Sequence, residues 1–328
     1  MRHLARVAAF LGLVGAVWIF WQGHPRQVFG LMRTAGFGLV LAGLLHVLGM
    51  LVNAVDWRTL IRGRRPGLAS MLHVVWIRES VNNLLPVARI GGELASFRLM
   101  RALGQRAAVA AATLVVDLQL TVISQLLFTL VGVGYLLTQS AASGALHLAG
   151  NVAWGLVAAV PVLAAFAFAV RASPFERVSR LLNRVVGGKL AALVGTSSRI
   201  DRQIMLIWRR TGVVVRYVFL WQLLQNLACT LEIWAALYFL HSPVSFLKAT
   251  ALEALIQAVS SAAFFVPGGL GVQEGGFVLI GRALGLDPPT SLALAGARRV
   301  RDLVVFLPGL VAWQLAESRV PVAAGKRD

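Results

Sequence analysis

Long apolar stretches alternate with short polar segments along the chain. The apolar runs lie at about 5–22, 29–54, 107–138, 148–170, 214–240 and 291–316. Several of them reach the roughly 20 residues that a helix needs to cross a bilayer. They are rich in Leu, Val and Ala and lack the strict alternation of membrane-barrel strands. Because lipid tolerates only helices or closed barrels, this pattern predicts an all-α integral membrane protein.

Two further stretches combine apolar residues with helix breakers and charges. Residues 84–93 read LLPVARIGGE after a half-apolar arm at 68–85, and residues 264–276 read FFVPGGLGVQEGG after an apolar arm at 248–266. Irregular backbone at membrane depth is tolerated where protein or a water-filled cavity surrounds it. We therefore expect two re-entrant helical hairpins around a polar central cavity. The expected fold has about seven transmembrane helices plus these hairpins, in a single membrane domain over 1–328.

The two interrupted stretches match each other in sequence. Each has a proline, a glutamate seven residues later and the tetrapeptide Arg-Ala-Leu-Gly fifteen residues later: Pro86, Glu93 and 101–104, and Pro267, Glu274 and 282–285. Downstream, Asp117 and Asp302 each precede a leucine, although this spacing differs by four residues. The match predicts an internal repeat, with one copy at about 68–138 and the other at about 248–316.

The distribution of basic residues predicts the topology. The chain has 31 Lys and Arg against 13 Asp and Glu, a formal net charge of +18, and the basic residues cluster between apolar runs. The longest basic segment is a loop at about 171–213. If both hairpins return to the side they enter from, the positive-inside rule places every strongly basic loop and both termini in the cytoplasm. The hairpins then enter a bacterial inner membrane from opposite sides, as in the inverted repeats of many transporters.

Composition narrows the function. Hydrophobic residues make up 58% of the chain, and mean hydropathy is +0.76. Short basic clusters beside apolar runs favour contact with anionic lipid head groups over nucleic acid. Cys229 is the sole cysteine, which excludes an intrachain disulfide. We find no nucleophile elbow, phosphate-binding loop or metal-ligand spacing, so we expect no catalytic residue, no metal and no cofactor.

The hairpin charges are the first candidate site. Glu93 and Glu274 would contact a head-group amine or carry a proton, since charges inside a membrane are costly to retain. The alternative is that each forms a structural salt bridge or caps a helix. Arg89, beside Gly91 and Gly92, would bind a lipid phosphate. Its alternative is an interfacial arginine whose head group reaches water.

The last span carries the second candidate site. Arg298, Arg299 and Arg301 would bind phosphate in the cavity, and the neighbouring Asp302 is spaced to pair with Arg298 on one helix face. The alternative is that the helix starts later and these arginines face the outer water. Asp117 and Gln119 are expected to partner an arginine of the cavity, whereas the neighbours Arg78 and Glu79 point to different faces. Other cavity candidates are Asn82, Asn83, Glu232, Glu253 and Gln257, each with a structural hydrogen bond or ion pair as the alternative. His46 and His73 would either face the cavity or, as is more common for a lone histidine on a helix, have a structural role.

The two interrupted segments resemble the signature segments of the transmembrane region of lysylphosphatidylglycerol synthases and their stand-alone, flippase-like relatives. The wording VNNLLPVARIGGELASFRLM, at 81–100, is most similar to the hopanoid-biosynthesis-associated HpnL branch. The resemblance covers nearly the whole chain and implies a region that moves lipids between leaflets. It maps the family's signature positions to Arg89, Gly91, Gly92 and Glu93, and to Pro267, Gly268, Gly269, Gly271, Gln273 and Glu274. Full-length synthases carry a soluble aminoacyl-transfer domain, and nothing after the last span would hold it, so we expect no aminoacylation.

Three functions remain for the structure to weigh. The first is a flippase for a polar-headed lipid, either a phospholipid or a hopanoid-related lipid. The second is a non-transporting partner that docks lipid-biosynthesis enzymes through the basic loop at 171–213. The third, a membrane-embedded enzyme, has the least support because no catalytic constellation is found.

Overall fold

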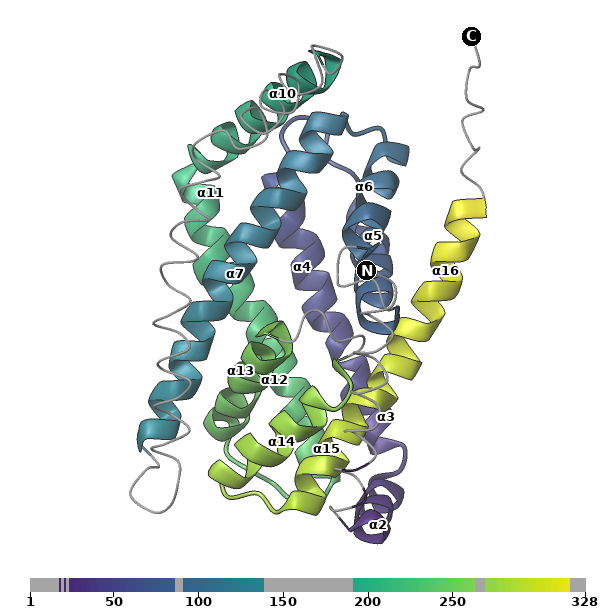
Figure 1. Cartoon of the computed structure of the whole chain (residues 1–328), viewed down its shortest axis with the longest axis vertical. Helices are drawn as coiled ribbons and strands as arrows, with labels where there is room; N and C mark the ends of the chain where they lie inside the picture. The colour runs from purple at the N-terminus through teal and green to yellow at the C-terminus, as the bar shows by residue number, and fades with distance from the viewer. Residues whose placement is uncertain are drawn as a thin grey trace.

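The computed structural model describes residues 24–85, 91–138, 191–262 and 269–318, together with Trp18 and Trp21. Every regular element in these ranges is helical (Figure 1). The helical fold predicted from the apolar runs is therefore confirmed for this part of the chain. Most of the first predicted span, the fourth span, and the signature residues Arg89, Pro267 and Gly268 lie outside the described residues.

Helices follow one another along the whole of the described chain. In chain order they are α2 (Pro25–Ala35), α3 (Gly38–Leu44), α4 (His46–Leu60), α5 (Leu68–Leu84), α6 (Gly91–Ala102), α7 (Ala107–Thr138), α10 (Ala191–Trp208), α11 (Thr211–Arg216), the π-helical turn η1 (Tyr217–Trp221), α12 (Gln222–Phe239), α13 (Phe246–Ala262), α14 (Val272–Ala283), α15 (Pro288–Arg301), the π-helical turn η3 (Asp302–Phe306) and α16 (Leu307–Ser318).

Two predicted spans agree closely with observed helices. α7 covers Ala107–Thr138, the range set by the apolar run. The last span starts at Pro288, three residues before the predicted boundary. Its start is fixed by Asp287, whose carboxylate accepts a hydrogen bond from the Thr290 backbone N–H at 3.1 Å, with proline at the first helical position. This N-cap and proline combination is a strong local signal for a helix start.

The prediction of one span over 29–54 was wrong. The helix breaks after Ala35, where Gly36 adopts φ +48°, and a new helical stretch runs from Gly38 to Leu60. Hydropathy cannot reveal this break, because a glycine with positive φ leaves the apolar run uninterrupted. Asp56 and Trp57, which follow the predicted end of this span, are charged or amphipathic residues typical of a membrane interface, yet both side chains are fully buried.

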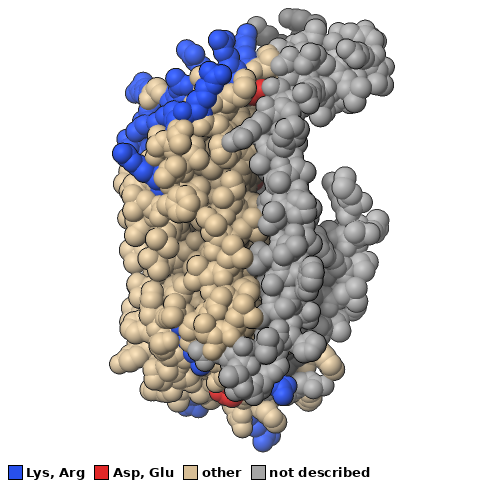
Figure 2. Space-filling model, turned by 90° about the vertical axis from the view of Figure 1, so that its left-hand side faces the viewer, with Lys and Arg blue, Asp and Glu red and all other residues tan. Residues whose placement is uncertain are grey.

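Two helical stretches among the described residues are long and apolar enough to cross a membrane, Gly38–Leu60 and Ala107–Thr138. Their outer faces are apolar, as are those of η1 and α16: Leu130, Phe219 and Leu315 are more than half exposed. Figure 2 shows a broad uncharged surface below an end where Lys and Arg gather. Exposed leucines in such a band are typical of a surface in contact with lipid.

The helices of the two predicted repeats correspond in length. α5 and α13 each have 17 residues, and α6 and α14 each have 12. α7 corresponds to the continuous stretch formed by α15, η3 and α16. α5 packs on α6, and α13 packs on α14. Figure 1 shows the first pair in the upper part of the molecule and the second in the lower part. The placement of these pairs relative to a bilayer stays a prediction.

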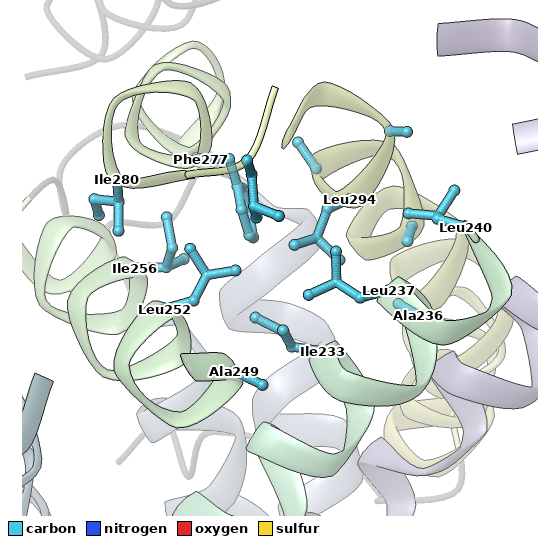
Figure 3. Close-up of a cluster of buried hydrophobic side chains, with 14 of the residues drawn as sticks. Ile233, Ala236, Leu237, Leu240, Ala249, Leu252, Ile256, Phe277, Ile280 and Leu294 are labelled. Carbon is cyan, nitrogen blue, oxygen red and sulfur yellow. The ribbon is translucent and has the colours of Figure 1, made fainter. Parts of the chain in front are cut away.

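We call α5, α6 and α7 the first unit, and α13, α14, α15, η3 and α16 the second unit. In each unit the first helix packs on the long helix of the other unit. α13 lies along α7, the long helix of the first unit, while α5 lies along η3 and α16 of the second. The Trp76 indole N–H donates to the Val305 carbonyl at 2.7 Å across the latter contact. One apolar core is formed by α12, α13, α14 and α15, where Ile233, Leu252 and Phe277 face one another (Figure 3). The exchanged packing joins both units into one structure.

Candidate functional site

A buried ion pair joins the first hairpin arm to the long helix α7. Arg78 Nη1 donates to Asp117 Oδ2 at 2.6 Å, and Arg78 Nη2 donates to Asn53 Oδ1 at 2.5 Å. The Tyr217 hydroxyl donates to the other Asp117 oxygen at 2.6 Å. The Arg78 guanidinium also lies 4.8 Å from the centre of the Trp57 ring. Each charge is therefore held by several partners, which offsets the cost of removing it from water.

Side chains from five elements build this group, which we call the Arg78 cluster. Its members are Asn53, Asp56 and Trp57 from α4, Arg78 from α5, Asp117 from α7, Tyr217 from η1 and Gln222 from α12. Gln222 donates to Asp56 at 2.9 Å, and Asn53 donates to the same carboxylate at 3.3 Å. The cluster thus ties the first hairpin to the surrounding helices.

A second group of buried charges, the Arg301 cluster, crosses the molecule from α4 to η3. It comprises His46, Glu79, Glu232, Glu253, Arg298, Arg299, Arg301, Asp302 and Glu274. His46 stands between two carboxylates, with Nδ1 2.8 Å from Glu232 and Nε2 3.0 Å from Glu79. Glu232 in turn lies 3.3 Å from Arg301 and 3.6 Å from Arg298. The chain of contacts links α5 of the first unit to α15 of the second.

The remaining contacts of this cluster lie within the second unit. Arg298 donates to Glu253, whose other oxygen accepts from Gln257 at 2.7 Å. Arg301 donates to Asp302 at 2.6 Å. The Arg301 side chain is only 5% exposed. The alternative of a later helix start is therefore wrong, because the helix starts at Pro288 and buries most of the Arg298 and Arg301 side chains, while Arg299 stays partly exposed.

Glu274 has both carboxylate oxygens engaged. One accepts from the Gly271 backbone N–H at 2.7 Å, which caps α14, and the other accepts from Arg299 at 2.6 Å. Gly269 and Gly271 have φ of +61° and +78°, a left-handed backbone that favours glycine and turns the chain into α14. Gln273 donates to Ser260 of α13 at 3.2 Å. Cap and ion pair, predicted as alternatives, are both present.

Glu93 is held much more loosely than Glu274. Asn82 accepts from the Gly92 backbone N–H at 2.9 Å and donates to one Glu93 oxygen at 3.5 Å. The other Glu93 oxygen is buried and has no hydrogen-bond partner in the described part of the chain. At Gly92, a Cβ atom would collide with the Arg78 carbonyl and the Asn82 side chain, so α6 approaches α5 too closely for any side chain there. Gly91 opens α6 beside it.

The structure brings some predicted residues together and separates others. Asp117 is paired with an arginine, but with Arg78 of the first arm and not with an arginine of the last span, and Arg78 and Glu79 face different partners as predicted. The expected pair between Arg298 and Asp302 does not form: Arg298 is bonded to Glu253, and Asp302 to Arg301 and Arg299. Gln119 accepts from the Trp208 indole instead of meeting an arginine. No contact links Glu93 to Glu274 among the described residues.

Sequence reasoning missed several members of the two clusters. Asn53, Tyr217 and Gln222 were not predicted, although each is a polar residue inside a predicted span or at its start. His46 was singled out by the sequence, but its two partners, Glu79 and Glu232, were not predicted. The helical period of 3.6 residues predicts on which face of its helix a polar residue lies. It does not predict which residue of another helix will be its partner.

Little space is left at the centre of the Arg301 cluster. Next to Glu232 and Arg298 the space amounts to about 10 Å³, at the limit for one water molecule. A larger polar cavity between the hairpins stays a prediction. The part of the chain that the structure describes does not contain three His, Cys, Asp or Glu side chains placed to hold a metal ion.

Buried charges enclosed by helices with apolar outer faces define the class: a helical membrane protein with several spans. The family model described as the lysylphosphatidylglycerol synthase TM region matches residues 4–309, and the chain belongs to this family. The chain is also similar to the UPF0104 membrane protein of Pyrococcus horikoshii, with 28% identity over 124 residues. That match spans 37% of this chain and 37% of the relative. No solved structure matches the chain.

Proposed function

We propose that the protein moves a polar-headed lipid between the leaflets of a bacterial inner membrane. Membership in a family that forms the membrane region of a lipid-modifying synthase supports a role with lipids. The observation that carries the proposal is the Arg301 cluster, a row of buried charges that joins the two units. Charged groups inside a membrane are expensive, and they mark paths for polar substrates.

Arg299 is the proposed phosphate contact. Its side chain is 29% exposed, the most accessible in the Arg301 cluster, and its guanidinium is paired with Glu274 and Asp302. A lipid phosphate that approached would compete with these carboxylates for the same donors, since arginine binds both anions in a similar planar geometry. The exchange would release Glu274 from its ion pair while the cap on α14 remains.

Glu93 is the proposed contact for a head-group amine or hydroxyl. A buried carboxylate oxygen without a partner costs free energy, and such groups are rare in folded proteins. A donor on the substrate would satisfy this oxygen. Because the space beside Glu232 and Arg298 is too small for a head group, transport requires a second conformation in which the two hairpins separate.

The topology belongs to the same proposal. The basic end would face the cytoplasm with both termini, and the two hairpins would enter from opposite sides as an inverted repeat. The matched helix lengths and the reciprocal packing support this arrangement. The substrate would be an anionic phospholipid or a hopanoid-related lipid. No nucleotide-binding motif is present in the sequence, so movement would be passive or driven by a gradient.

Liposomes test the proposal. The purified protein would be reconstituted with head-group-labelled lipids, and the loss of label accessible to a membrane-impermeant quencher would be followed over time. We expect scrambling well above empty vesicles, with a large loss in Arg299→Gln and Glu93→Gln. The matched control is Arg282→Gln, an exposed arginine on α14, which should scramble like the wild type. Rates equal to empty vesicles for anionic, zwitterionic and hopanoid lipids alike would overturn the proposal.

A second candidate is a non-transporting partner of lipid-biosynthesis enzymes. The exposed arginines of the described part of the basic segment, Arg199, Arg202 and Arg209, favour this role. It predicts that reversing these charges abolishes function in the cell while Glu93→Gln and Arg299→Gln leave function intact. The opposite pattern favours transport.

A further inference from the structure

An open cavity of about 880 Å³ lies at the basic end of the molecule, away from both charge clusters. Three segments distant in sequence form its walls: the connection between α4 and α5, the connection between α6 and α7, and α10. Four arginines line it, Arg62, Arg64, Arg65 and Arg106, together with Gln203 of α10. Figure 2 shows the basic side chains gathered at this end. The volume is within the range of typical small-molecule sites.

Hydrogen bonds fix the backbone of this cavity. Gln105 donates to the Arg64 carbonyl at 2.9 Å, Arg58 donates to the Pro66 carbonyl at 2.8 Å, and Arg65 donates to the Ile61 carbonyl at 3.2 Å. Gly63 and Gly104 have φ of +86° and +81°, so each turns its connection sharply. The connections that carry the arginines are therefore held in place before any ligand arrives, which lowers the entropic cost of binding.

The cavity carries positive charge without acidic neighbours. Its lining contains no Asp or Glu, and none of its four arginines has a carboxylate within 4.0 Å among the described residues. Burial, together with the positive charges of Arg65 and Arg62, lowers the pKa of nearby Arg210. Like charges held together on a fixed frame repel one another, and an anion placed between them would relieve the repulsion.

We propose that this cavity is a phosphate-binding site, separate from the path assigned to the lipid head group within the membrane. Arginine presents a planar fork of donors that matches a phosphate, and Arg64 and Arg106 line the cavity from two different connections. The phosphate belongs either to a lipid head group in the adjacent leaflet or to a soluble compound. Binding at this site does not depend on lipid translocation.

Arg64 and Arg106 are the residues to change. Only the backbone of Arg64, not its side chain, takes part in the hydrogen bonds of the loop, and Arg106 likewise contributes its backbone carbonyl to the start of α7. The double variant Arg64→Gln with Arg106→Gln should therefore fold normally. The matched control is Arg26→Gln with Arg33→Gln, which removes two exposed charges from α2 at the other end of the molecule (Figure 1).

Two probes would be titrated into the full chain in neutral detergent. Inorganic pyrophosphate, followed by calorimetry, tests a soluble ligand. Dioctanoyl phosphatidic acid, followed by native mass spectrometry against phosphate-free dioctanoylglycerol, tests a lipid head group. We expect saturable binding of at least one phosphate probe, weakened about tenfold or more in the double variant, since a charge-assisted hydrogen bond contributes at least about one factor of ten. Binding should also weaken between about 0.05 and 0.5 M salt.

The two probes distinguish a lipid head group from a soluble phosphate. Binding of phosphatidic acid alone assigns the site to a lipid head group, and binding of pyrophosphate assigns it to a soluble phosphate. The proposal is overturned if neither probe binds, if the double variant binds like the wild type, or if the α2 control loses as much affinity as the double variant. A failure of lipid scrambling in liposomes would leave each of these outcomes unchanged.

Discussion

The two units have helices of matching length but a different arrangement of charged side chains. The first unit consists of α5, α6 and α7, and the second of α13, α14, α15, η3 and α16. In the first, the short arm carries the base, Arg78, and the long helix carries the acid, Asp117. In the second, the arm carries the acid, Glu253, and the long helix carries the base, Arg298. Arg298 follows Asp117 by 181 positions, the interval that also separates Glu93 from Glu274. The polarity of the ion pair is thus reversed between the two units, and the long-helix residues Asp117 and Arg298 stand at matching positions, whereas Arg78 and Glu253 do not.

The shared glutamates differ in the same way. Glu274 has a cap and an ion pair, whereas Glu93 has, among the described residues, one distant amide and an oxygen without a partner. The two units therefore share their helix lengths, but their polar side chains differ in what they bind. One unit supplies an unsatisfied acceptor, and the other supplies an accessible cation in Arg299.

Exchanging the charges of the first unit should have the largest effect. Arg78→Asp or Asp117→Arg alone leaves two like charges buried together and should lower the free energy of unfolding by about 3–5 kcal/mol. The double exchange gives the first unit the polarity of the second and should recover at least half of this loss. Thermal unfolding of the purified protein in detergent measures both. A double variant as unstable as the single ones would show that the polarity cannot be reversed on this frame.

Gly92→Ala should come next. The added methyl group would collide with the Arg78 carbonyl and Asn82, so we expect a loss of about 1–3 kcal/mol from overpacking. Gly134→Ala on α7 is the control, because nothing lies within 4 Å of its added carbon. The matching position in the second unit is occupied by Gln273, which fits there without such a collision. Equal stability of the two alanine variants in thermal unfolding would contradict a tighter first hairpin.

The two glutamates should give the smallest and most unequal effects. Glu274→Gln weakens the ion pair with Arg299 and the cap on α14, and we expect a loss of about 1–2 kcal/mol. Glu93→Gln removes a buried charge that is poorly bonded, so stability should stay within about 0.5 kcal/mol of the wild type. The same unfolding assay compares them. A larger loss for Glu93→Gln would mean that its carboxylate is structural.

Helix boundaries were predicted correctly where residues close in sequence determine them. α7 was predicted with both boundaries because its apolar run ends at a basic turn and a polar loop, and the two short hairpin helices follow helix-breaking residues. The break at Gly36 and the burial of Asp56 and Trp57 were missed, because both depend on what neighbouring helices supply. The partner of Asp117 was predicted by type as an arginine. That it is Arg78, with Tyr217 100 residues away as second partner, is a product of tertiary packing.

The reciprocal packing of the two units also sets the order in which the molecule is completed. Trp76 on α5 bonds to Val305 on η3, 229 residues later in the chain. The helix α5 is therefore synthesised long before η3 and α16, the elements on which it packs. Contacts of such sequence separation form late and slow folding. During synthesis the Arg78 cluster would hold α5 to α4 and α7, and the final helix would close the structure only once the last residues have entered the membrane.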